Sequence, residues 1–250
     1  MKNILPALLL SFVLLFPQIA AAQNYIEAEG IIYYESGMSP NQMRRAAILD
    51  AYRYLAEQVD TLYVTSESTV KNLREMDDQI NTKVQAALRG AKVIQASRNN
   101  DGSFRAIVRM PMYGSANSLS SAVLNETVTV EEFPKPKFTN IRTEINYTGL
   151  IIDCRGLNLS QAVTPAIKSV GGIDVYEYKN VGYQTAVSKG MVEYSTELSS
   201  PRAGNTPLVI KAVKISGACD VIVSDDDADK ILAANQQTNI LFNCAVVLVR

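Results

Sequence analysis

The sequence predicts an α/β chain (α+β in arrangement) with a helix-over-sheet first domain and a second, mixed α/β domain. β-favouring runs alternate with amphipathic helical patterns along the chain. Its 250 residues exceed the size of one average domain. Pro134 and Pro136 interrupt regular structure between the two halves. We therefore expect a first domain at 23–114, a linker at 115–140 and a second domain at 141–250.

Residues 1–22 have the pattern of a secretory signal peptide. Lys2 is followed by an apolar run from 4 to 16, and small residues precede a predicted cleavage between Ala22 and Gln23. The run is shorter than the roughly 20 apolar residues that span a bilayer. We therefore expect no transmembrane segment in the mature chain, and a periplasmic protein, or one that is secreted or peripherally associated with the outer membrane.

The first domain is predicted from strand and helix patterns in the order β-α-β-α-β-β. The first strand is predicted at 26–34. Ser39, Pro40 and Gln42 then form a helix start with a capping box. The predicted elements that follow are a core-facing helix to Val59, a short strand at 62–68, a helix at 70–88 ended by Gly90 at C′, and a hairpin of strands 91–97 and 104–110. One layer of helices should cover a mixed sheet.

The second domain is predicted mainly from apolar strands. Ser224 is the expected N-cap of a helix at 225–236, and the run at 240–249 reads as a central strand. The other predicted elements are strands at 149–154, 191–194 and 220–224, a hairpin across 166–178, a short helix at 182–189 and one alternating strand at 207–216.

Composition excludes several functions. The sequence contains no histidine, which rules out serine–histidine and cysteine–histidine nucleophile systems. Its 24 basic and 25 acidic residues give no basic block for nucleic acid. Catalysis by carboxylates alone stays open, but we expect no enzyme, no catalytic residues and no cofactor. Glu27 and Glu29 are read as solvated surface rather than as an acid–base pair.

Four clustered aspartates are a candidate metal site, and three cysteines are candidates for a disulfide. Asp225, Asp226, Asp227 and Asp229 have the chemistry for Ca²⁺, but they also suit the first turn of a helix. Their spacing is not that of a calcium loop, so we expect no metal. The cysteines fall in or beside predicted core strands; they are expected to be reduced, with a Cys219–Cys244 disulfide possible. Their positions are Cys154, Cys219 and Cys244.

The sequence resembles a known family of envelope proteins. The segments that carry the resemblance in the first half are 27–30, the alanine-rich 45–57, 64–70 and 90–94. They are similar to the Lpp-twenty outer-membrane lipoprotein family and to the N-terminal domain of flagellar assembly protein T. Segments 147–153, 207–213 and 220–224 look like the domain that follows it in envelope proteins of this group. The resemblance implies a dodecin-like first domain without catalytic residues. The family's lipid-bearing cysteine is absent near the cleavage region, so membrane anchoring is not carried over.

We therefore expect a non-enzymatic exported protein that acts through protein contacts in the cell envelope, with an envelope or appendage protein as partner. Assembly or stabilisation of a flagellum or other surface structure is the most concrete version, and an oligomeric small-ligand carrier is the alternative. The expected interaction surface contains Ile31, Tyr33 and Tyr34, because the first strand has more apolar residues than one buried face requires. Either a second copy, giving a homo-oligomer, or the second domain would cover it.

Overall fold

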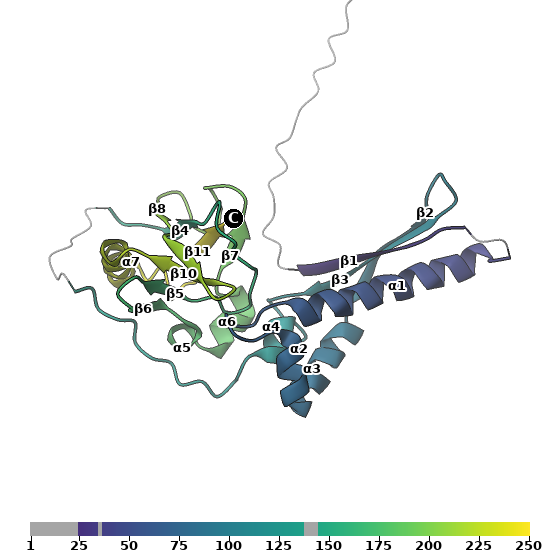
Figure 1. The fold of residues 1–250 in the computed structure, drawn as a ribbon, viewed down its shortest axis with the longest axis horizontal. Helices are drawn as coiled ribbons and strands as arrows, with labels where there is room; N and C mark the ends of the chain where they lie inside the picture. Colours follow the sequence, from purple (N-terminus) through teal and green to yellow (C-terminus); the bar gives the residue numbers. More distant parts are fainter. Residues whose placement is uncertain (1–24, 35–36, 138–144) are drawn as a thin grey trace, which may run out of the picture.

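The computed structural model describes residues 25–34, 37–137 and 145–250. The predicted signal peptide, with Ala22 and Gln23, lies outside the described residues. The chain is a mixed α/β protein: a first domain with helices on one three-stranded sheet, and a second domain with two four-stranded sheets (Figure 1). Among the described residues, the helices are all too short or too polar to span a bilayer.

The first domain is built around one long helix that lies on an antiparallel sheet. The sheet has the order β1-β3-β2, and every strand pair in it is antiparallel, so the prediction of a mixed sheet was wrong. Gly30 allows α1 to approach β1, because a Cβ there would lie 2.2 Å from the carbonyl oxygen of Ala47. The elements are β1 (Tyr25–Ile32), α1 (Pro40–Thr61), α2 (Val70–Met76), α3 (Asp78–Arg89), β2 (Lys92–Arg98) and β3 (Phe104–Pro111).

The predicted start of α1 is confirmed in detail. Ser39 and Gln42 form the reciprocal capping box, with Pro40 at the first helical position. The buried face repeats every four residues, so the apolar periodicity of the sequence identifies the side that packs on the sheet. These buried residues are Met43, Ala47, Ala51, Leu55 and Val59.

Two predictions for the first domain were wrong. The segment 62–68 is not a strand; within the described residues Tyr63 forms isolated bridges, to Thr69 and to Ala162. The predicted single helix at 70–88 is two helices, because the Asp77 carboxylate accepts the backbone N–H groups of Gln79 and Ile80 and starts a new helix there. Gly90 ends the second of them as its C-cap residue, with φ −79°.

The connection between the domains contains a buried helix. α4 (Leu119–Val123) starts at Ser118, and all five of its residues are buried. The segment with Pro134 and Pro136 has no regular structure, as predicted, but it lies on the second domain. Phe133 stacks on Tyr176 with ring centroids 6.3 Å apart, and the backbone N–H of Lys137 donates to Asp229 at 2.9 Å.

The second domain contains two sheets of different character. The sheet β7-β11-β4-β8 is parallel throughout, and the sheet β6-β5-β10-β9 is mixed. The elements are β4 (Gly149–Asp153), β5 (Ile167–Ser169), β6 (Asp174–Tyr176), α5 (Tyr178–Val181), α6 (Tyr183–Lys189), β7 (Glu193–Ser195), β8 (Pro207–Lys211), β9 (Lys214–Ser216), β10 (Asp220–Val223), α7 (Asp225–Thr238) and β11 (Val246–Val249).

Two predicted strands of the second domain needed correction. The alternating run at 207–216 is divided between sheets: Ala212 donates to Asp153 in one sheet, and Val213 donates to Ile222 in the other. The run at 240–249 is a strand only from Val246. Before it, a left-handed Asn239 ends α7 and the chain turns. Apolar periodicity alone does not reveal where a strand changes sheets or where a turn is buried.

Candidate functional site: the exposed sheet of the first domain

Among the residues that the structure describes, helices cover only one face of the sheet of the first domain. Along β1, side chains alternate between buried and exposed, and the buried ones, such as Ala28, face α1. On the other face, Glu27 forms an ion pair with Arg109, and Glu29 forms one with Arg105 that includes a second contact of 2.9 Å. The guanidinium of Arg109 also lies 4.5 Å from the centre of the Tyr25 ring. The open face is therefore a ladder of charge pairs with aromatic and aliphatic side chains between them.

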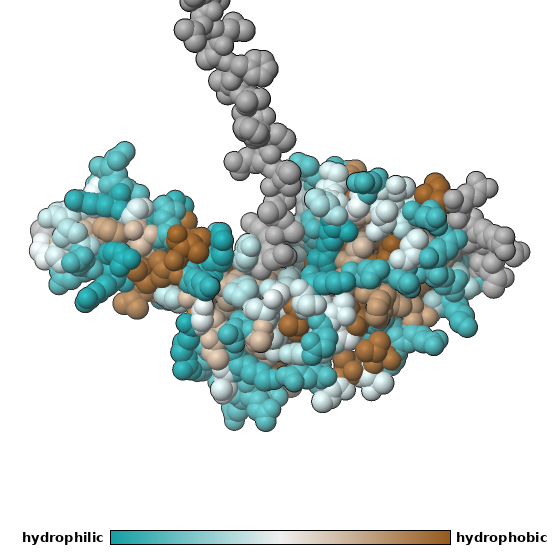
Figure 2. Space-filling view, turned by 180° about the vertical axis from the view of Figure 1, so that it is seen from behind, coloured by the Kyte–Doolittle hydropathy of each residue, from teal (hydrophilic) through white to brown (hydrophobic). Residues whose placement is uncertain are grey.

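The predicted interaction surface lies at the end of this sheet that is far from the second domain (Figure 1). Tyr33 is 68% exposed, Tyr34 59% and Ile31 37%. Two other apolar residues of β1 are not part of this surface, because Ile26 is buried and Ile32 packs against the core. Figure 2 shows an apolar area on the first domain, at the left of that view, bordered by polar side chains.

The second domain contacts the first at the opposite end of α1. The loop between α1 and α2, residues 62–69, enters the second domain. There Val163 and Thr164 donate their backbone N–H groups to Tyr63 and Val64, at 3.0 and 2.9 Å. In the same loop, Ser66 Oγ donates to a carboxylate oxygen of Asp220 at 3.0 Å. The second domain therefore holds the first by this loop and leaves the open face of the sheet exposed.

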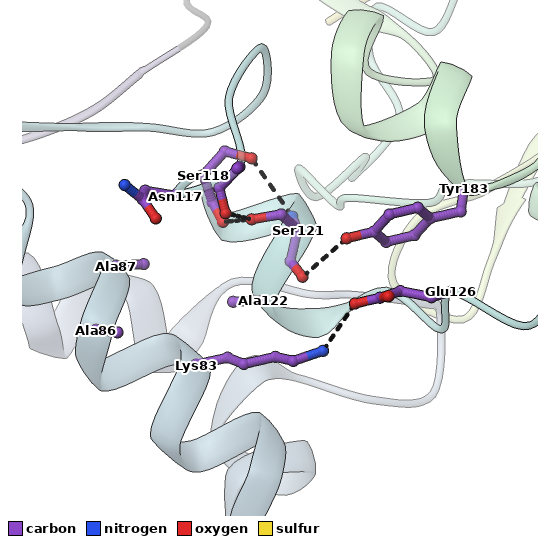
Figure 3. Close-up of a pocket in the computed structure, with 10 residues that line it drawn as sticks. Lys83, Ala86, Ala87, Asn117, Ser118, Ser121, Ala122, Glu126 and Tyr183 are labelled. Carbon is purple, nitrogen blue, oxygen red and sulfur yellow. Dashed lines mark hydrogen bonds and ion pairs between the residues drawn. The ribbon is translucent and has the colours of Figure 1, made fainter.

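A hollow of about 290 Å³ lies where α3, α4 and α6 meet (Figure 3). Its floor consists of small side chains, including Ala86 and Ala122. At its side, Lys83 Nζ lies 3.0 Å from a carboxylate oxygen of Glu126, and the Tyr183 hydroxyl donates to the Ser121 carbonyl at 3.4 Å. No sequence motif marks this hollow, because its polar residues come from three separate segments.

The titratable groups of the hollow are held in their ordinary forms. The hydrogen bond that Lys83 donates to Glu126 raises the pKa of Lys83, and burial raises the pKa of Tyr183, assisted by the charge of Glu126. Near neutral pH, Lys83 therefore stays protonated and Tyr183 keeps its proton. The arrangement suits the binding of a small polar group better than proton transfer.

Three of the four candidate aspartates at the start of α7 have partners within the fold. The Asp225 carboxylate accepts the N–H of Gly171 at 2.9 Å, Asp227 contacts Lys230 at 2.9 Å, and the buried Asp229 accepts the backbone N–H of Lys137 in the linker. The fourth, Asp226, is exposed. In the described part of the chain, no three acidic, cysteine or histidine side chains are grouped to hold a metal ion.

The three cysteines are buried thiols. Cys154, Cys219 and Cys244 are free, and burial raises the pKa of Cys154 and Cys219 to about 12. Such thiols are poor nucleophiles. Among the tyrosines of the first domain, Tyr52 donates its hydroxyl to the Ala91 carbonyl at 2.7 Å.

Each of the two domains matches the model of a known protein domain. Residues 27–110 match the model of the LPP20 lipoprotein family, the Lpp-twenty family of the sequence analysis. The first domain is an LPP20 lipoprotein domain. Residues 149–250 match the second domain of Treponema pallidum Tp0624. The curated proteins gave no significant match. The LPP20 match begins at Glu27 and ends at Met110, and so covers most of β1 and nearly all of β3, the two strands that form the charge ladder.

Proposed function

We propose that this chain is a non-enzymatic, exported envelope protein that binds another protein through the exposed sheet of its LPP20 domain. The proposed role is to assemble or stabilise a surface structure, with a flagellum as the most concrete case. The observation that carries the proposal is a sheet whose second face stays open and in which the outer edges of β1 and β2 have no partner strand among the described residues. An open sheet with exposed aromatic residues at one end is typical of an interaction surface.

The LPP20 match supports the envelope part of this proposal, since its description names a lipoprotein. The pattern of residues 1–22 supports export. The side chains of the hollow support a non-enzymatic role. Its lysine, Lys83, is paired with the Glu126 carboxylate, and its tyrosine, Tyr183, is protonated near neutral pH. Binding by a preformed surface requires no chemistry from these groups.

Site-specific photo-crosslinking in cells that make the native protein tests the proposal. A photo-reactive residue at Tyr33 should form a covalent adduct with one defined envelope protein, identified by mass spectrometry. The same residue at Val170, which is 59% exposed on the second domain, is the matched control. If both positions give the same adducts, or neither gives any, the first domain is not the binding surface.

A small-ligand carrier is the second candidate function, and the hollow beside α3 favours it. Its volume, about 290 Å³, lies at the lower limit of ligand pockets, which measure roughly 300–1,000 Å³. Native mass spectrometry of the purified protein should then detect a bound small molecule. Ala122→Leu, which fills the floor of the hollow, should remove it. A purified protein of the bare mass of the polypeptide would reject the carrier function.

A further inference from the structure

We infer that copies of this chain associate head to tail, with the free edge of β2 in one copy beside the free edge of β1 in the next. The inference rests on the proposed function, because it identifies a second copy as a partner of the exposed sheet. It follows from three features of that sheet: one row of charges, the direction of the strands and the position of α1.

The row of charges is incomplete within one copy. In the register of the sheet, Glu27 lies opposite Arg109, and Arg109 lies opposite Lys92, so the three residues form one row across β1, β3 and β2. Arg109 is already paired with Glu27. Lys92 is exposed, and within the described residues no carboxylate forms an ion pair with it. The row thus ends in two adjacent positive charges, an unfavourable cross-strand pair that an acidic strand on the free edge of β2 would relieve.

The acidic strand that fits this edge is β1 of another copy. Its open face carries Glu27 and Glu29 two residues apart, so both point to the same side as Lys92. With Lys92 beside Glu27 of the next copy, the two adjacent positive charges of the row lie between two carboxylates. At the other end of the strands, Arg98 is level with Ile32. Phe104 lies opposite both residues and is buried on the face toward α1, so Arg98 is on that face and Lys92 is the charged residue of β2 on the open face.

The direction of the strands permits this addition without turning the copy over. β1 and β2 both run antiparallel to β3 and therefore run in the same direction. A second copy in the same orientation forms a parallel β2–β1 pair and keeps its α1 on the same side of the sheet. In a single copy, α1 does not fully cover β2. Val93 lies opposite the buried Val108, on the face toward α1, and is still 39% exposed. The α1 of the next copy would lie beside it.

Symmetric pairing is disfavoured by the same charges. Two β1 edges would bring Glu27 and Glu29 against themselves, and a β2 edge contains no carboxylate that could pair with Lys92 of another copy. Only the unlike edges are complementary, and a contact between unlike surfaces generates a ring or an open chain of copies rather than a closed dimer. This kind of growth suits a protein of a surface structure.

Sedimentation velocity of the purified full chain across a wide concentration range tests the inference. We expect dimers, trimers and larger species in an open series, which weaken at high salt because the contact is ionic. Lys92→Glu should weaken association about tenfold or more, which is about 1.4 kcal/mol or more. Lys214→Glu is the matched control, since Lys214 is an exposed lysine on β9, an edge strand of the second domain. It should leave the series unchanged.

A mixing experiment makes the test specific. Glu27→Lys should also weaken association by itself, and circular dichroism checks that both variants are folded. When Lys92→Glu and Glu27→Lys are mixed, each β2 edge again has an oppositely charged β1 edge available, and the open series should return. If Glu27→Lys does not fold, Glu27→Gln replaces it, with weakened association as its expected result.

Three results would overturn the inference: a monomer at every concentration, association that stops at a dimer, or association that Lys92→Glu leaves unchanged. The outcome for the proposed function is separate. A monomeric chain whose position 33 still crosslinks to a different envelope protein would reject head-to-tail association and leave protein binding standing. A chain that neither self-associates nor crosslinks would reject both.

Discussion

The two domains use β-sheets in opposite ways. In the second domain, all four residues of β10 and of β11 are buried, as are four of the five in β4, because neighbouring elements cover both faces. In the first domain, β1 and β3 alternate between buried and more exposed residues, since a helix covers only one face. The central strands of the second domain therefore contribute to its core with both faces. The sheet of the first domain contributes one face and leaves the other face and two strand edges exposed.

The largest expected effect comes from the covered strands. Leu248→Ala in β11 removes a side chain with no exposed surface and should lower the free energy of unfolding by about 3 kcal/mol. Ile31→Ala on the open face of β1 should change it by less than about 0.5 kcal/mol. Urea denaturation measures both. Equal losses would mean that the open face is as well packed as the core, and would break the contrast.

The contact between α1 and β1 tests how closely the covered face of the first domain is packed. Gly30→Val places a side chain against the backbone of Ala47 and Ala51 and should cost about 2 kcal/mol through overpacking. Leu49→Ala, at a solvent-facing position of the same helix that is 69% exposed, is the control. Thermal unfolding should show a lower midpoint for Gly30→Val alone. An unchanged midpoint would contradict the close approach of helix and strand.

The smallest effect tests the charge ladder. The hydrogen bond from Arg105 holds the pKa of Glu29 below its ordinary value of 4.5. A lowered pKa in the folded state stabilises the fold above that value, and the stabilisation is lost as the pH falls through the lowered pKa. Because the pair is exposed to solvent, Glu29→Gln should cost less than about 0.5 kcal/mol at neutral pH and nothing in strong acid.

Urea titrations at several pH values measure this difference. Glu67→Gln, at an exposed glutamate in the loop after α1, is the control and should show no such dependence. A cost for Glu29→Gln that persists in strong acid would show that the ion pair is not its source.

Local signals predicted much of the fold. The capping box at Ser39, the four-residue period of α1 and the Asp101–Gly102 hairpin each depend on neighbouring residues, and each is present in the structure. The break at Asp77 is a local N-cap inside a continuous apolar period, and the change of sheet at Ala212 depends on a partner far along the chain, Asp153, so periodicity revealed neither. The candidate surface follows the same rule: exposed residues of β1 were expected, but the row from Glu27 to Lys92 needs the register of three strands.

The loop at 62–69 makes part of the first domain depend on the second. Its backbone is hydrogen-bonded to the second domain at Val163 and Thr164, and its Ser66 side chain reaches Asp220. The chain segment between the domains is therefore not their only connection. A first domain without the second would lose these partners, and the backbone carbonyls of Tyr63 and Val64 would need water in their place.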